Sequence, residues 1–158
     1  MSAFSEKEIE FLQGQRLGRI ATVGAGGKPH VVPVCFAYAD GALYTPIDEK
    51  PKRGDSASLR RVRNILRNPA VCLLVDHYEN DWTQLAWVQV RVRASLVTDA
   101  QERALALAAL RERYPQYRAM DLEARPLIRI VPMRVPRWSA RSAGADSRAR
   151  PKETDAER

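Results

Sequence analysis

Histidine and cysteine are scarce in this chain of 158 residues, and their scarcity argues against several kinds of active site. The sequence has two histidines, His30 and His77, and two cysteines, Cys35 and Cys72. No pair of them has the spacing of zinc ligands, so we expect no metal site. Both cysteines lie in apolar runs and are predicted to be buried, reduced thiols of an intracellular protein.

Motifs that mark phosphate-binding loops and hydrolases are also missing. The chain has no G-x-x-x-x-G-K-[ST] loop, no G-x-G-x-x-G after a strand and no G-x-S-x-G elbow. The glycine-rich segment 24–27 is therefore interpreted as a hairpin turn. No secretion signal and no apolar run long enough to span a bilayer is visible, which predicts a cytoplasmic protein without a membrane partner.

What the chain does have is a local excess of positive charge. Its formal net charge is +7, and its 45% hydrophobic residues are ordinary for one globular domain. Residues 48–67 contain seven cations, which are Lys50, Lys52, Arg53, Arg60, Arg61, Arg63 and Arg67, against three carboxylates. More than half of the net charge therefore lies in twenty residues, which favours a specific pocket over a generally basic surface.

Alternation and turn signals predict six strands, over residues 17–23, 30–38, 43–47, 70–76, 85–97 and 127–138. Helices are expected from about Ser5 to Gly14, from Asp55 or Ser56 to Arg67, and from Thr98 to about Arg113. Capping boxes at Ser5–Glu8 and Thr98–Gln101 support the first and the last. In the second helix the predicted apolar stripe is Leu59, Val62, Ile65 and Leu66.

These elements occur mostly as hairpins, which is typical of an antiparallel sheet and not of a doubly wound parallel one. The predicted fold is mainly β, a small six-stranded antiparallel barrel with peripheral helices. The barrel domain covers residues 1–138. Residues 139–158 lack apolar periodicity and are predicted to form a disordered tail.

The cation cluster has a place in this order of elements. Lys50, Lys52 and Arg53 follow a strand and precede the N-terminus of a helix, where free N–H groups and the helix dipole favour an anion. The segment suits one phosphate group. A solvated cationic surface is the alternative, and a nucleic-acid backbone is a weaker one because the cations form no stripe and no aromatic residues interleave with them.

The long strand 85–97 has two different faces. Ala86, Val88, Val90, Val92 and Ala94 are expected to face the core. The opposite face carries Leu85, Trp87, Gln89, Arg91 and Arg93. Such a face suits either a homodimer interface or an ordinary half-exposed strand.

An ordered set of short segments resembles a known family. The segments are Arg19–Thr22, Lys28–Val34, Leu43–Thr45, Lys50–Arg53, Leu59–Arg61, Asn64-Ile65 and Asn68-Pro69. Together they resemble the flavin/deazaflavin split-barrel superfamily, which includes pyridoxamine 5′-phosphate oxidase. Val75–Tyr78, Asp81-Trp82 and Trp87-Val88 are similar to a subgroup that uses the deazaflavin coenzyme F-420.

The resemblance implies a homodimer with two cofactors at its interface, each either F-420 or FMN. The cofactor phosphate would lie against Lys50, Lys52 and Arg53 with Thr45 nearby, and the ring would lie near the backbone of Pro33 and Val34. Trp87, Gln89 and Trp138 would contribute from facing strands or from the partner subunit.

The implied function is an oxidoreductase that exchanges a hydride between this cofactor and a small organic substrate. Two alternatives stay open: an FMN enzyme like pyridoxamine 5′-phosphate oxidase, and a flavin- or deazaflavin-binding carrier or sensor without turnover. The chain departs from true pyridoxamine 5′-phosphate oxidases, because Asp48–Arg53 replaces their Ser-Arg-Lys. No residue is assigned as catalytic; Tyr44, Tyr78 and His77 are possible general acids, and a structural role is the alternative for each.

Overall fold

The computed structural model describes residues 4–48 and 56–143, and no helix in these ranges is long and apolar enough to cross a membrane. The helices are α1 (Glu6–Gly14), α2 (Ser56–Arg67), α3 (Ala100–Arg113) and α4 (Ala140–Ala143). The strands are β1 (Gly18–Val23), β2 (Pro29–Val34), β3 (Ala37–Ala39), β4 (Ala42–Pro46), β5 (Ala70–His77), β6 (Ala86–Leu96), β7 (Leu127–Arg134) and β8 (Arg137–Ser139).

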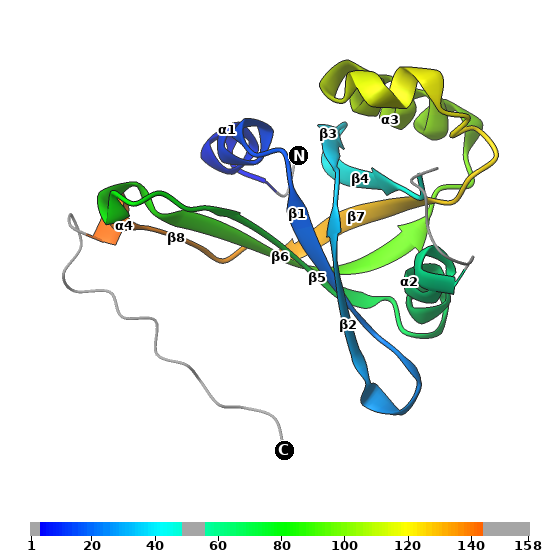
Figure 1. Ribbon diagram of the computed structural model, residues 1–158, viewed down its shortest axis with the longest axis horizontal. Helices are drawn as coiled ribbons and strands as arrows, with labels where there is room; N and C mark the ends of the chain where they lie inside the picture. The colour runs from blue at the N-terminus through cyan, green and yellow to red at the C-terminus, as the bar shows by residue number, and fades with distance from the viewer. Residues whose placement is uncertain (1–3, 49–55, 144–158) are drawn as a thin grey trace.

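All strands belong to one curled antiparallel sheet, with the helices around it (Figure 1). Its strand order is β2-β1-β5-β6-β7-β4-β3, and β8 pairs with the outer end of β6. The mainly β fold predicted from the sequence is confirmed. The count of six strands is wrong, because the predicted strands 30–38 and 127–138 are each divided into two.

The division between β7 and β8 has a local physical reason. Val135 and Pro136 separate β7 from β8, and proline has no N–H to give to a ladder. The Pro136 carbonyl nevertheless accepts a hydrogen bond from the Gln89 N–H at 3.0 Å, so β8 continues along β6 beyond the kink. The other division, at Cys35 and Phe36, separates the two edges of the sheet.

The two hairpin turns were predicted correctly. Asp40 and Gly41 join β3 to β4 with positive φ at both residues, as a two-residue hairpin turn requires. In the turn between β1 and β2, Gly26 and Gly27 have φ of 68° and 74°, a conformation that favours glycine.

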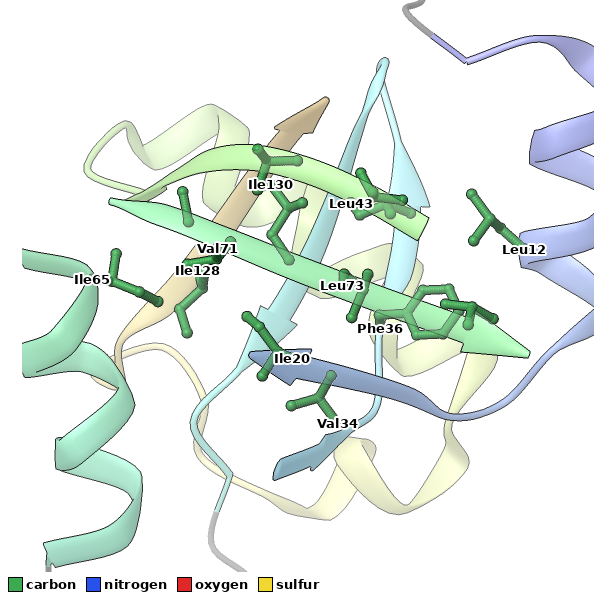
Figure 2. Close-up of a cluster of buried hydrophobic side chains, with 14 of the residues drawn as sticks. Leu12, Ile20, Val34, Phe36, Leu43, Ile65, Val71, Leu73, Ile128 and Ile130 are labelled. Atoms are coloured by element: carbon green, nitrogen blue, oxygen red, sulfur yellow. The ribbon is translucent and has the colours of Figure 1, made fainter. Parts of the chain in front are cut away.

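Strand β6 forms the spine of the main core. Its inward residues Val88, Val90, Val92 and Ala94 are buried as predicted, whereas Ala86 is half-buried at the end of the strand. Figure 2 shows how side chains from β1, β4, β5 and β7 meet at this core, with Leu12 of α1 at one end and Ile65 of α2 at the other. Full burial of each valine contributes about 1.5–3 kcal/mol relative to exposure.

A second, smaller core lies between α3 and the pair β3–β4. Here Ala106, Leu107 and Leu110 of α3 pack with Tyr44 of β4. The N-cap of α3 is Asp99, whose carboxylate accepts the Glu102 N–H at 2.7 Å. The predicted capping box at Thr98–Gln101 was therefore displaced by one residue, because Asp is as good a cap as Thr and stands next to it.

The other two helices, α1 and α2, differ in how closely they agree with the prediction from the sequence. The capping box of α1 is confirmed in both directions, between Ser5 and Glu8. In α2, Val62 and Ile65 are buried in the main core, but Leu66 is 68% exposed and does not belong to the apolar stripe. The predicted caps at Asp55 and Ser56 and the side chain of Leu59 lie outside what the structure describes.

The break at Cys35 and Phe36 is stabilised from α3. The Phe36 N–H donates to the hydroxyl of Tyr114 at 3.1 Å, and the same hydroxyl lies 2.9 Å from the carbonyl oxygens of Phe36 and Arg16. Tyr114 thus satisfies the backbone groups that leave the ladder where the chain passes from β2 to β3.

The neighbouring Arg113 fixes the end of α1. Its guanidinium donates to the carbonyls of Leu12 at 3.1 Å and Gln13 at 2.8 Å at the helix C-terminus, where carbonyls lack the usual helical partners; the Leu12 carbonyl also accepts the Gln15 N–H at 3.3 Å. It also lies over the ring of Phe36 at 5.3 Å. One end of α3 therefore holds both the N-terminal helix and the break in the sheet.

The boundary of the predicted disordered tail is corrected. Ser139 ends β8, and residues 140–143 form the short helix α4, with the Ala140 N–H donating to the Leu85 carbonyl at 2.8 Å. The rest of the predicted tail, residues 144–158, lies outside the described residues.

We expect Tyr114→Phe to lower the free energy of unfolding by about 1–3 kcal/mol, because it leaves buried backbone groups of Phe36 without a partner. Denaturant titration measures this difference. Tyr78→Phe is the control, since the Tyr78 side chain is exposed. Equal stabilities of the two variants would contradict the role given to Tyr114.

Candidate functional site

Four neighbouring strands, β2, β1, β5 and β6, turn one set of side chains away from the core. We call this surface the outer face. Its residues are exposed or half-buried, whereas the alternate residues of β1, β5 and β6 are mostly buried. Along the four strands in turn, the outer face consists of Pro29, Val31, Pro33, Arg19, Ala21, Val23, Ala70, Cys72, Leu74, Asp76, Trp87, Gln89, Arg91 and Arg93.

Pro33 and Gln89 were both predicted to lie near the cofactor ring. The strand register brings these two residues into one row of the outer face. Pro33 pairs with Arg19, Arg19 with Leu74, and Leu74 with Gln89. With about 4.8 Å between strands, Pro33 and Gln89 are about 14 Å apart along the row. The side chain of Val34 is buried in the main core, so only its backbone could contribute to a ring site.

The two predicted tryptophans are also neighbours. Trp87 of β6 is directly opposite Trp138 of β8, and opposite Asp76 of β5 on its other side. Trp138 is 41% exposed. Asp76 forms an ion pair with Arg19, so this end of the outer face combines indole rings with a neutralised charge pair.

Thr45 lies far from these residues. It pairs with Ile128 of β7, which pairs with Leu96 at the inner end of β6. Leu96 is nine positions after Trp87 in β6, which corresponds to about 30 Å along the strand. The Thr45 side chain is 1% exposed, and its hydroxyl has no hydrogen-bond partner in the structure.

An unsatisfied buried hydroxyl is costly, and it is a sign of a missing ligand or water. Thr45 was predicted to lie near the cofactor phosphate, and its unpaired hydroxyl fits such a group. The phosphate ligands themselves, Lys50, Lys52 and Arg53, lie outside the described residues.

One arginine of the cation cluster points into the protein. Arg61 of α2 is 7% exposed, and its Nε has no partner. Burial lowers the pKa of Arg61, while the charge of Asp48 opposes this shift. Tyr117 donates to Asp48 at 3.3 Å. Arg60, by contrast, is exposed.

The positive charges of Arg60 and Arg61 also act on His30 of the edge strand β2. Burial lowers the pKa of His30, and the cations Arg60 and Arg61 lower it further. His30 is therefore a neutral imidazole near neutral pH, with a buried Nδ1 that lacks a partner. It is poorly suited to donate a proton from a charged state.

The three possible general acids differ in their surroundings. Tyr44 donates to Glu102 at 2.8 Å, and burial raises the pKa of Tyr44 to about 12, so it anchors α3 rather than supplying protons. His77 lies 2.8 Å from Glu79 at the surface. Tyr78 is largely exposed. Tyr44 pairs with Arg129 of β7, away from the residues predicted to contact the cofactor ring, whereas His77 pairs with Ala86, the neighbour of Trp87.

A groove of about 1020 Å³ crosses the outer face beside the Gln89 row. Its cations are Arg91 and Arg93 of β6 and Arg134 of β7, and we call it the arginine groove. The sequence analysis placed Arg91 and Arg93 on the face of the strand 85–97 that points away from the core. Arg134 was missed, because only the register between β6 and β7 shows that it stands opposite Arg91.

No group of three or more histidine, cysteine or acidic residues that could hold a metal ion occurs within residues 4–48 and 56–143. Both cysteines are free thiols. The functional groups of the outer face are the Trp87 indole, its arginines, the Gln89 amide, the Cys72 thiol, the Asp76 carboxylate that pairs with Arg19, and the backbone of an edge strand.

A model of one protein family, pyridoxamine 5′-phosphate oxidase, matches residues 4–139. The chain belongs to this family. The match covers both cores and every strand of the sheet, so the family predicted from short sequence segments is confirmed.

Known proteins extend this result. The chain is 40% identical to the 5a,11a-dehydrotetracycline/5a,11a-dehydrooxytetracycline reductase of Streptomyces rimosus over 73 residues, which is 46% of this chain and 49% of the relative. The match thus spans about half the length of that reductase.

Solved structures confirm the split-barrel fold. A conserved hypothetical protein of Mycobacterium tuberculosis superimposes with a TM-score of 0.72 at 24% identity, covering 90% of this chain and 89% of the other. A FAD-binding protein of Mesorhizobium loti has a TM-score of 0.60 at 24% identity, with coverages of 85% and 92%. At the coarse level, the family and the reductase relative support an oxidoreductase.

Thr45→Val tests whether the buried hydroxyl serves a ligand. Valine has a similar shape and removes an unpaired polar group, so the cofactor-free variant should be at least as stable as wild type. Its affinity for the cofactor should fall. Differential scanning calorimetry and cofactor titration measure the two effects.

Thr22→Val is the matched control, because Thr22 is equally buried but its hydroxyl accepts a hydrogen bond from Asn64 at 3.0 Å. This variant should lose about 1–3 kcal/mol of stability. A Thr45→Val protein that is destabilised to the same degree would show a structural role for Thr45 instead.

Proposed function

We propose that this protein is a reductase that binds a phosphate-bearing flavin-type cofactor between two copies of the chain and transfers a hydride to a small organic acceptor. We favour coenzyme F-420 over FMN. That preference rests on the segments Val75–Tyr78 and Asp81-Trp82, which are similar to those of the F-420-using subgroup.

The observation that carries this proposal is the separation of the site residues along β6. Thr45 belongs to one end of this strand, and Trp87 and Trp138 to the other, about 30 Å further along the strand. We infer that one cofactor meets both sets because they come from different copies of the chain.

The exposed outer face supports the same arrangement. Val31, on the edge strand β2, is 59% exposed, and two residues that border this face are exposed as well: Trp138 of β8, opposite Trp87, and Met133 of β7, in the arginine groove. Large apolar side chains gathered on one face are typical of an interface. A two-fold axis over this face would bring the Trp87 end of one copy toward the β2 strand of the other.

The residues present fit the proposed cofactor. Lys50, Lys52 and Arg53 would bind its phosphate, with the Thr45 hydroxyl as a further donor, while the backbone of Pro33 and Val34 would border the ring. When bound, the ring supplies the two-electron chemistry. The protein orients the ring, excludes water with Trp87 and Trp138, and offers the Gln89 amide as a hydrogen-bonding group.

A reduction of an activated C=C bond is the reaction we favour, in line with the named activity of the Streptomyces rimosus relative. An FMN enzyme like pyridoxamine 5′-phosphate oxidase, or a carrier without turnover, would share the phosphate site. Reoxidation of the reduced cofactor by an added enone distinguishes the reductase from a carrier.

Titration of the purified protein with F-420 and with FMN, followed by fluorescence, tests the cofactor. We expect Lys52→Ala to weaken binding about tenfold, because it removes a charge-assisted contact to phosphate. Arg67→Ala, at the far end of α2, should change it less than twofold. Failure of both cofactors to bind wild type would overturn the proposal. Equal losses of cofactor affinity in both variants would show that the cations act only through a diffuse electrostatic field and form no specific phosphate site.

The dimer is tested by light scattering. Wild type should have twice the mass of one chain, and Val31→Lys should produce monomers by placing a charge in the interface. Leu66→Lys is the control, since Leu66 is a similarly exposed apolar residue on α2. A monomeric wild type, or dissociation by Leu66→Lys alone, would contradict the proposed interface.

A further inference from the structure

Two arginines of the arginine groove occupy directly paired positions on neighbouring strands. Arg91 of β6 is the register partner of Arg134 of β7, at the point where a bulge shifts the pairing. Arg93 is two residues further along the same face of β6. Like charges directly opposite each other destabilise a sheet unless something neutralises them.

Nothing in the described part of the chain neutralises these three charges. Other arginines pair with carboxylates: Arg19 with Asp76, Arg111 with Glu123, Arg129 with Glu102 and Arg137 with Glu8. Arg91 instead donates to the neutral amide of Gln89 at 3.0 Å. Among the described residues, no Asp or Glu lines the arginine groove.

The rest of the groove is suited to an apolar body. Apart from the Gln89 amide, its other lining residues are small or apolar, and include Ala21, Val23, Ala70, Cys72 and Met133. Burial raises the pKa of the Cys72 thiol, and the Arg91 cation opposes this shift, which places Arg91 beside the apolar floor. The groove therefore joins a flat apolar surface to three uncompensated cations.

We propose that the arginine groove binds an organic anion, a molecule with a flat apolar body that carries a carboxylate or phosphate group. The anionic group lies between Arg91 and Arg134, with Arg93 as a further donor. The body lies over Ala21, Ala70 and Cys72. An anion between the two paired arginines removes the repulsion that the register creates, because each guanidinium donates to the same oxyanion.

The place of the groove identifies this anion as the substrate, an assignment that rests on the proposed function. The row that contains Val31, Ala21, Cys72 and Arg91 lies two residues from the row that contains Pro33 and Gln89. Two residues of strand correspond to about 7 Å. A molecule in the groove thus lies next to the surface where the cofactor ring would lie.

Binding can be tested without any cofactor by titrating the full-length protein with 2-naphthoate and with neutral 2-naphthamide in a calorimeter. We expect naphthoate to bind and to weaken as salt is added, and naphthamide to bind at least tenfold more weakly. Equal affinity for the two probes would overturn the proposal. So would an absence of naphthoate binding, as when a second copy fills the groove.

The variant Arg91→Gln/Arg134→Gln should weaken naphthoate binding about tenfold or more. Its stability should equal or exceed that of wild type, because a like-charge pair is removed. Arg63→Gln, an exposed arginine of α2, is the matched control and should bind as wild type does. Equal losses in both variants would show that only net charge matters, and displacement of naphthoate by duplex DNA would show a nucleic-acid surface; either result contradicts the proposal.

Turnover distinguishes the two possible sources of the anion. With an enone that carries a carboxylate, the double variant should have a KM at least tenfold higher, an unchanged cofactor Kd, and a normal KM for the methyl ester of the same enone. A weaker cofactor Kd with an unchanged KM would assign the groove to the cofactor's own anionic groups and overturn the substrate assignment. If wild type binds no cofactor, the proposed function fails, while the naphthoate result stands by itself.

Discussion

The passage of the chain through Cys35 and Phe36 is the constraint on which the rest of the structure depends. At this point the backbone leaves β2, one edge of the sheet, and enters β3, the other edge. A backbone that leaves a ladder inside a protein needs other partners for its N–H and C=O groups. Tyr114 supplies them from the end of α3, and the adjacent Arg113 ties the C-terminus of α1 to the same place.

This arrangement determines which surface remains for function. Because α3 packs on β3 and β4, and α1 and α2 contribute to the main core, the helices leave the outer face of β2, β1, β5 and β6 accessible. That face combines features that are rare on a surface that stays exposed to solvent. On it or at its border lie exposed apolar residues such as Val31, a pair of tryptophans, and two arginines opposite each other without a carboxylate. The proposed second copy, cofactor and anionic substrate would account for each of them.

The candidate site was predictable in part. The alternation of β6 predicted which residues face outward, and the structure confirms the outward side of Trp87, Gln89, Arg91 and Arg93. The distance between Thr45 and the tryptophans could not be predicted, because it depends on which ends of β4, β7 and β6 are paired. Arg134 was missed in the sequence for the same reason: it is 43 positions from Arg91 along the chain but opposite it in the sheet. Lys50, Lys52 and Arg53 lie outside the described residues, so their role stays a prediction.

By itself, the sequence determined the features that depend on neighbours along the chain. These are the capping box of α1, the Asp40-Gly41 turn, the inward face of β6, the mainly β composition of the fold and, through short segments, the family. Only the tertiary structure decided that two predicted strands are divided, that Leu66 is exposed while Arg61 is buried, and that Ser139 belongs to the sheet. Those outcomes depend on contacts between distant segments, such as Tyr114 with Phe36 and β8 with β6. Local propensity carries no information about such contacts, because their energy arises only when the two segments meet.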